Sequence, residues 1–450
     1  MPAFVFLTSN QSIPERIFME FTDKKLKDKA VLVGLVWGNE TQESVDKSLD
    51  ELERLLETAG GEAIARLTQN KDTPDVRTVI GSGKASELAY LCACNDATLV
   101  VFDCELSPSQ IRNIEDIVGD GVRVIDRSML ILDIFALHAV TGEGKLQVEL
   151  AQLKYTAPRL MGKGTELSRL GGGIGTRGPG ESKLETDRRH LMRRVHALET
   201  QIAEMDKNRR TMRAARDKSG IPEIAIVGYT NAGKSTLLNR LTDAGILAED
   251  KLFATLDPTT RKFILPCGES VLLTDTVGFI NKLPHHLVRA FRSTLEEACN
   301  ADILMIIIDA SDENFRDQLA VTENLLCELG ASGKPMLYVF NKCDRGIVDL
   351  GSLGREAADN TVYISALTGQ GCELMVSKLE GMVLADKRRV TYVIPNSEAG
   401  AVNTLYKNAT VESVEYGAEG ITVVALADAK ARGMMRKYAI DDISEPTDEE

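Results

Sequence analysis

The sequence predicts an α/β protein in which a P-loop domain follows a small α/β domain with a helical coiled-coil hairpin and precedes a small α+β domain. Strand-like runs alternate with amphipathic helices over residues 30–126 and 221–385. Apolar residues at heptad spacing lie between them. A phosphate-loop motif spans residues 228–235. We therefore expect four units, at residues 1–127, 128–220, 221–386 and 387–450.

Composition indicates an ordinary globular protein. The 450 residues are 43% hydrophobic and 27% charged, and no apolar run reaches the length of a membrane span. The N-terminus has no basic leader followed by an apolar stretch, so we expect no secretion signal and a cytoplasmic location. Of the eight cysteines only Cys92 and Cys94 are near neighbours, which predicts free thiols rather than a zinc site.

Charge is distributed unevenly along the chain. The net charge is −14, yet residues 151–220 contain sixteen Lys or Arg against eight Asp or Glu. A solvated helix face is the usual reason for runs of charge, but it does not explain an excess of one sign. The segment is therefore a candidate surface for a polyanion.

The first domain is predicted from its strand and helix signals. "AVLVGLVW" (30–37) indicates a buried strand, and the helix expected over 41–60 has its leucines on one face. Strands at 97–104 and 121–127 flank a helix at 107–119. "GSGKAS" (81–86) resembles a phosphate loop superficially, but Thr78 and Ala85 replace the required Gly and Ser or Thr. We expect a turn before a helix there.

Two heptad seams predict an antiparallel helical hairpin. The first consists of Leu146, Leu150, Leu153, Ala157 and Leu160, and the second of Leu184, Leu191, Val195, Leu198, Ile202 and Met205. A glycine-rich loop of about twenty residues joins them, and fifteen residues of first helix give an arm of roughly 22 Å. After residue 387 we expect strands, a helix over 397–408 and a final helical segment, followed by a disordered acidic tail.

The phosphate loop follows a buried strand and precedes a helix, as nucleotide binding requires. Backbone N–H groups and the helix N-terminus would hold the phosphates, Lys234 would supply charge across the β- and γ-phosphates, and Ser235 would bind Mg²⁺. The residues expected here are Gly228, Tyr229, Thr230, Asn231, Ala232, Gly233, Lys234 and Ser235.

Three further motifs occur in order at strand ends. "LLTDTVGF" (272–279) places a carboxylate near the magnesium and a backbone N–H near the γ-phosphate. "LYVFNKCD" (337–344) and "VYISAL" (362–367) provide groups that select guanine. The expected contacts are Asp275, Thr276, Val277, Gly278, Asn341, Lys342, Cys343, Asp344, Ser365, Ala366 and Leu367. Together the four motifs predict a GTPase.

The segment "LFATLDPTTRKF" (252–263) is where a switch threonine should bind Mg²⁺, and Thr255, Thr259 and Thr260 all qualify by chemistry. After Gly278 the chain has Phe279, whereas Ras-like GTPases have a glutamine that orients the attacking water. Slow unassisted hydrolysis and stimulation by a partner should follow. No arginine finger is identifiable, although Arg289 and Arg292 lie on the following helix.

These motifs, the hairpin and "RLGGGIGTRGPGESKLETDRR" (169–189) together closely resemble the bacterial HflX family over about residues 30–385. The resemblance favours Thr255 as a magnesium ligand beside Ser235, with Asp275 near the ion, and Lys234, Thr255 and Gly278 as catalytic residues. It adds Phe253, Ala254, Thr255, Leu256 and Asp257 to the expected GTP contacts. It implies a GTP- and GDP-binding monomer that binds the large ribosomal subunit, is stimulated there and separates subunits under stress. Some members are also reported to hydrolyse ATP through the N-terminal region.

The glycine-rich loop contains Gly173-x-Gly175-x-x-Gly178, the spacing of a dinucleotide loop, but a helix rather than a strand precedes it. We expect it to enter an RNA cavity, which the resemblance places near the peptidyl-transferase centre; a plain linker is the alternative. The expected phosphate contacts are Arg169, Arg177, Lys183, Arg188 and Arg189. Splitting of ribosomes, assembly of large subunits and a nucleotide-gated RNA scaffold remain open.

Overall fold

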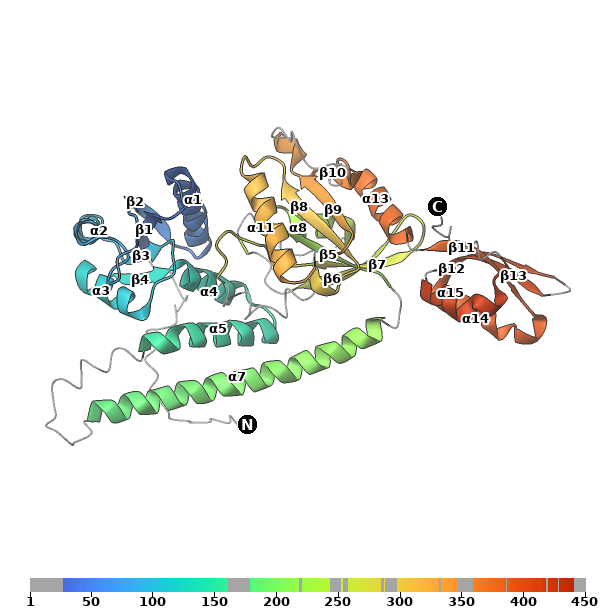
Figure 1. Ribbon diagram of the computed structural model, residues 1–450, viewed down its shortest axis with the longest axis horizontal. Coiled ribbons are helices and arrows are strands. Elements are labelled where there is room, and N and C mark those ends of the chain that lie inside the picture. The colour runs from blue at the N-terminus through green and yellow to red at the C-terminus, as the bar shows by residue number, and fades with distance from the viewer. Residues whose placement is uncertain are drawn as a thin grey trace, which may run out of the picture.

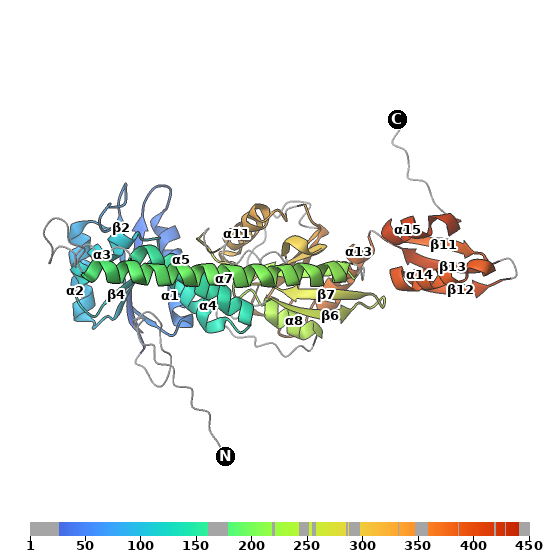
Figure 2. The same ribbon diagram turned by 90° about the horizontal axis from the view of Figure 1, so that it is seen from below.

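The computed structural model describes residues 27–160, 179–217, 221–242, 252–253, 258–284, 287, 298–331, 333–346, 359–385, 387–417, 420–427 and 429–440. Within them the strands form three sheets, one in each of three domains that follow one another along the molecule (Figure 1). A long helix, α7, runs beneath the first two domains (Figure 2). No described helix is long and apolar enough to cross a membrane. The expected α/β architecture is confirmed.

The first domain is a parallel sheet of order β2-β1-β3-β4 with helices on both faces. α1 and α4 share one apolar cluster with alternate residues of the sheet, and α2 and α3 cover the opposite face. The strands are β1 (Lys29–Val36), β2 (Glu62–Asn70), β3 (Leu99–Phe102) and β4 (Arg123–Asp126); the helices are α1 (Gln42–Thr58), α2 (Ser82–Cys94), α3 (Pro108–Val118) and α4 (Arg127–His138).

Local capping explains where these helices begin. Thr41 accepts a hydrogen bond from the Ser44 N–H at the start of α1, and Asp126 does the same for Met129 at the start of α4. The start of α2 differs from the expectation. We expected a turn at residues 81–86, but α2 begins at Ser82, so most of the "GSGKAS" stretch forms its first turn and the expectation is wrong.

The helical hairpin is antiparallel, as expected. Along α5 (Gly142–Leu160), Glu143 pairs with Arg209 and Glu149 with Arg194, so the partner numbers on α7 (Pro179–Asp217) fall as those on α5 rise. α5 begins four residues before the expected seam, and its most buried apolar residues join the first domain's core through α4. It is therefore the middle layer between α4 and α7. Residues 161–178 lie outside the described residues.

The second domain has a sheet of order β10-β9-β8-β5-β7-β6 in which only the β6–β7 pair is antiparallel. α8 and α13 pack on one face and α11 on the other. Because the parallel strands end at one edge, the loops that follow them meet there. The strands are β5 (Glu223–Gly228), β6 (Thr259–Ile264), β7 (Ser270–Asp275), β8 (Ile303–Asp309), β9 (Met336–Asn341) and β10 (Thr361–Tyr363); the helices are α8 (Lys234–Thr242), α11 (Phe315–Glu328) and α13 (Cys372–Leu384).

The third domain is an antiparallel sheet of order β11-β13-β12 whose buried face packs on two helices. Its elements are β11 (Arg388–Ile394), α14 (Gly400–Asn408), β12 (Ala409–Tyr416), β13 (Ile421–Ala427) and α15 (Ala429–Met435). Strict alternation along β13 puts every second residue into the core. The acidic tail lies outside the described residues.

Candidate nucleotide-binding site

The phosphate loop joins the buried strand β5 directly to α8, which begins at Lys234. Gly233 has a φ of +96°, and a Cβ there would strike the Asn341 side-chain nitrogen. Only glycine fits this approach. The loop therefore brings backbone N–H groups and a helix N-terminus to one point, which is an anion site.

Lys234 and Ser235 are held in the loop by short contacts. The Lys234 Nζ donates to the Tyr229 carbonyl at 2.8 Å and to that of Gly228 at 3.2 Å. Burial lowers the pKa of Lys234 to about 8, although nearby Asp275 acts in the opposite direction. Phosphate oxygens would favour the charged ammonium. The Ser235 hydroxyl donates to an Asp275 carboxylate oxygen at 2.6 Å. Hydroxyl and carboxylate oxygens suit Mg²⁺, so these residues fit the expected ion.

The segment after β7 lies directly against the phosphate loop. The Thr230 N–H donates to the Phe279 carbonyl at 2.7 Å, and the Phe279 N–H donates to the Gly228 carbonyl at 3.1 Å. The Phe279 side chain is 1% exposed, in the core beneath α11. It points away from the site and has no group that could orient water.

Asn341 connects the loops expected to surround guanine. Its side-chain oxygen accepts from the Ala366 N–H at 2.8 Å, and its side-chain nitrogen donates to the Ala232 carbonyl at 2.8 Å. Lys342 has a φ of +64° and pairs with Asp309 at 2.8 Å, which stabilises this strained backbone. Asp344 is exposed, and a hydrogen bond from Ser365 lowers its pKa, so its carboxylate is ionised and accessible to a base.

The structure distinguishes only some of the threonines that could bind Mg²⁺. Thr260 Oγ1 lies 2.9 Å from Thr274 Oγ1 between β6 and β7, so its hydroxyl is used within the sheet. Ala254, Thr255, Leu256 and Asp257 lie outside the described residues. The Phe253 side chain packs edge-on against Phe135 of the first domain, with ring centroids 4.7 Å apart, in an apolar cluster that also contains Tyr229 of the phosphate loop.

Of the expected RNA contacts, Arg188 and Arg189 are exposed on α7. The side chain of Lys183 and all of Arg169 and Arg177 lie outside what the structure describes, as do Arg289 and Arg292. The structure thus brings the phosphate and guanine motifs together at one sheet edge and leaves the tip of the arm undescribed.

A contact between domains was missed by the sequence patterns. One apolar cluster contains residues of α1 and α4 together with six residues around the phosphate site: Tyr229, Leu252, Phe253, Val277, Ile280 and Leu287. The motif spacing marks only groups that face the nucleotide. The sequence signal that the first domain covers the rim of the phosphate site was the apolar character of Phe253, Val277 and Ile280.

Three family models match successive parts of the chain. They are described as GTP-binding GTPase N-terminal (residues 46–136), GTP-binding GTPase Middle Region (138–216) and 50S ribosome-binding GTPase (223–342). A relative named GTPase HflX from Lacrimispora saccharolytica is 49% identical over 403 residues, covering 89% of this chain and 94% of its own. GTPase HflX from Escherichia coli is 42% identical over 389 residues, covering 86% and 90%. A solved GTP-binding protein from Sulfolobus solfataricus in complex with GDP is 26% identical, covers 79% of this chain and 98% of its own, and has a TM-score of 0.44.

Proposed function

Since the chain belongs to the HflX family of GTPases, we propose that it binds the large ribosomal subunit, hydrolyses GTP faster there and separates ribosomal subunits under stress. The observation that carries this proposal is the union of a GTPase domain with a basic helical arm. Arg188 and Arg189 are exposed on α7, and residues 151–220 carry the excess of cations in an otherwise acidic chain. The family description of residues 223–342 as a 50S ribosome-binding GTPase supports the same partner.

The chain's own residues account for part of the reaction. Water attacks the γ-phosphorus, the bond to the β–γ bridging oxygen breaks, and GDP and phosphate leave. Lys234 and the loop N–H groups would stabilise charge on the phosphates, and the Gly278 N–H would contact the γ-phosphate. Mg²⁺, when held by Ser235 and Thr255 near Asp275, supplies further positive charge. Phe279 orients no water, so we expect the ribosome to complete the site.

The proposal is tested by comparing nucleotide affinity with the response to ribosomes. A variant with residues 171–180 shortened should keep its affinity for GDP and GTP but lose stimulation by large subunits. Intact ribosomes mixed with the wild-type protein and GTP should scatter less light as they separate. Loss of nucleotide affinity in the shortened variant would show that the loop holds nucleotide instead. Unchanged scattering, with binding only to immature large subunits, would favour an assembly role.

Two matched double variants test the arm. Arg188→Ala with Arg189→Ala should weaken binding to large subunits and reduce the slope of log affinity against log salt by about 1 to 2. Arg261→Ala with Lys262→Ala removes an exposed basic pair from β6, a strand of the GTPase domain. This control should bind as the wild type does. Equal effects of the two pairs would contradict a docking role for the arm.

A further inference from the structure

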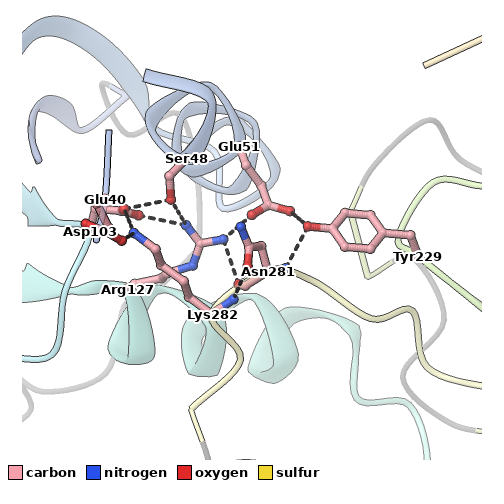
Figure 3. A network of polar contacts seen from close by, with 8 residues as sticks. All are labelled: Glu40, Ser48, Glu51, Asp103, Arg127, Tyr229, Asn281 and Lys282. Carbon is pink, nitrogen blue, oxygen red and sulfur yellow. Dashed lines mark hydrogen bonds and ion pairs between the residues drawn. The ribbon is translucent and has the colours of Figure 1, made fainter. Parts of the chain in front are cut away.

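A polar network crosses from the first domain to the rim of the nucleotide site (Figure 3). Its members on the first domain are Glu40, Ser48, Glu51, Asp103 and Arg127, and those on the GTPase domain are Tyr229, Asn281 and Lys282. Tyr229 is the second residue of the phosphate loop, and Asn281 follows Gly278 by three positions. The network therefore touches both the loop that holds phosphate and the segment expected to sense it.

The backbone of Asn281 is held from both sides. The Arg127 guanidinium donates to its carbonyl at 3.0 Å, and its N–H donates to the Tyr229 hydroxyl at 2.6 Å. Both side chains also donate to the carboxylate of Glu51 on α1. A single carboxylate of the first domain thus orients the two groups that fix this backbone.

The centre of the network is buried, its outer members Lys282 and Glu40 are partly exposed, and its charges depend on one another. Arg127 and Asp103 have side chains 3% and 4% exposed and lie 2.7 Å apart. Lys282 pairs with Asp103 at 2.9 Å and with Glu40 at 2.8 Å. Burial alone would lower the pKa of Arg127, but Glu51 and Asp103 outweigh it and raise that pKa. Removing one partner leaves a buried charge uncompensated, so the contacts should form and break as a unit.

The segment held by the network occupies the space beside the phosphate loop. A Cβ added at Gly278 would lie 2.8 Å from the Thr230 Cα and 3.0 Å from the Lys234 Nζ. Gly278 therefore lies directly against the loop backbone and beside the lysine expected to reach the γ-phosphate. Because residues 278–279 are in direct contact with the loop, we expect a γ-phosphate bound between Lys234 and the Gly278 N–H to move them outward. That movement would break the hydrogen bond from the Thr230 N–H to the Phe279 carbonyl.

We propose that Glu51, Arg127 and Tyr229 form a latch on Asn281, which holds the first domain against the GTPase domain until a γ-phosphate displaces Gly278. Displacement moves Asn281 away from its donor, the Arg127 guanidinium, and from its acceptor, the Tyr229 hydroxyl, and the first domain is released as the latch opens. The contact between the first domain and the GTPase domain thus depends on whether GTP or GDP is bound. This rests on the assignment of Gly278 to the γ-phosphate made above.

The test compares two glutamates of the same helix in the isolated protein, without ribosomes. Glu51→Gln turns an amide donor toward Arg127, whereas Glu53→Gln disturbs only a pair with Arg66 inside the first domain. Opening the latch should favour the nucleotide that displaces Gly278. The ratio of the Kd for a non-hydrolysable GTP analogue to the Kd for GDP should fall about 3- to 10-fold in Glu51→Gln, as the loss of one hydrogen bond implies. It should not change in Glu53→Gln.

Trp37, the chain's single tryptophan, gives a second measurement. It lies in the turn that ends at Glu40, whose N–H donates to the Trp37 carbonyl at 3.1 Å and whose carboxylate pairs with Lys282. In the wild type the GTP analogue, but not GDP, should change its emission or its quenching by acrylamide. In Glu51→Gln the changed signal should be present before nucleotide is added.

Tyr229→Phe removes only the hydroxyl and serves where Glu51→Gln fails to fold. It should lower the same ratio, and the double variant should show less than the sum of the two effects. A ratio that is unchanged or higher in Glu51→Gln or Tyr229→Phe would overturn the latch, as would additive effects. Failure of ribosome stimulation would remove the proposed partner and leave these results standing. If the protein bound no guanine nucleotide, the assignment of Gly278 to the γ-phosphate would be wrong, and both the latch and the proposed function rest on that assignment.

Discussion

Replacing Asn341 with alanine should weaken GDP and GTP binding to the same extent. Its side chain is 2% exposed and joins the loops at Ala232 and Ala366 through two hydrogen bonds of 2.8 Å. Alanine leaves a carbonyl and an N–H without these partners, at about 1–2 kcal/mol each. If this whole cost of about 2–4 kcal/mol falls on the complex, because the free loops relax and the bound loops cannot, binding weakens by at most roughly 30- to 1000-fold.

The assay is titration of both nucleotides into Asn341→Ala, with Asn360→Ala as the control. Asn360 is exposed in the turn before β10, and its replacement should leave both affinities unchanged. Because Asn341 lies on the side of the base, the ratio of the GTP and GDP affinities should stay at the wild-type value. A loss confined to GTP, or no loss at all, would refute the role of Asn341 in shaping the guanine site.

Four other substitutions give separable results. Asp344→Asn should shift preference from GTP to xanthosine triphosphate in a competition assay, because the amide can donate to the 2-oxo group; unchanged GTP affinity would contradict the guanine assignment. Thr260→Ala should change magnesium-dependent GTP binding little, since this hydroxyl pairs with Thr274, whereas Thr255→Ala should weaken it; the reverse order would exclude Thr255. Burial raises the pKa of Asp133 from 3.8 to about 6. The free energy of unfolding is therefore higher while this carboxyl is protonated, and it falls as the pH rises through about 6. Asp133→Asn should therefore raise the free energy of urea unfolding by about 1–3 kcal/mol at pH 8 and not at pH 4, and equal effects at both pH values would disprove this.

The sequence predicted those elements in which the buried residues form a recognisable apolar pattern. The strand at 30–37 is buried on both faces and reads as one apolar run, and α1 carries leucines at helical spacing. β2 (Glu62–Asn70) was not identified because it is an edge strand with mostly half-buried, polar residues. α4 lacked a period because it is buried nearly all round, between the sheet and α5.

The phosphate and guanine motifs were predictable because phosphate chemistry fixes both residue type and spacing. The contacts of Glu51 and Arg127 were not, since they join residues 76 positions apart on different elements. One of several glutamates on an amphipathic helix is normally interpreted as a solvated side chain. Only the tertiary arrangement, which places α1 and α4 beside the phosphate loop, gives it a partner.

The helix α7 has a mechanical consequence. It contains 39 residues and is therefore a rod of ~58 Å. Its C-terminal end is separated from β5, the strand that carries the phosphate loop, by only five residues of chain. A rod of that length pivoting at its C-terminal end is a lever, in which ~6° of rotation displaces the other end by about 6 Å. Small angular changes between the first two domains would thus be magnified at the tip of the arm, and small forces on the tip would be felt at the pivot.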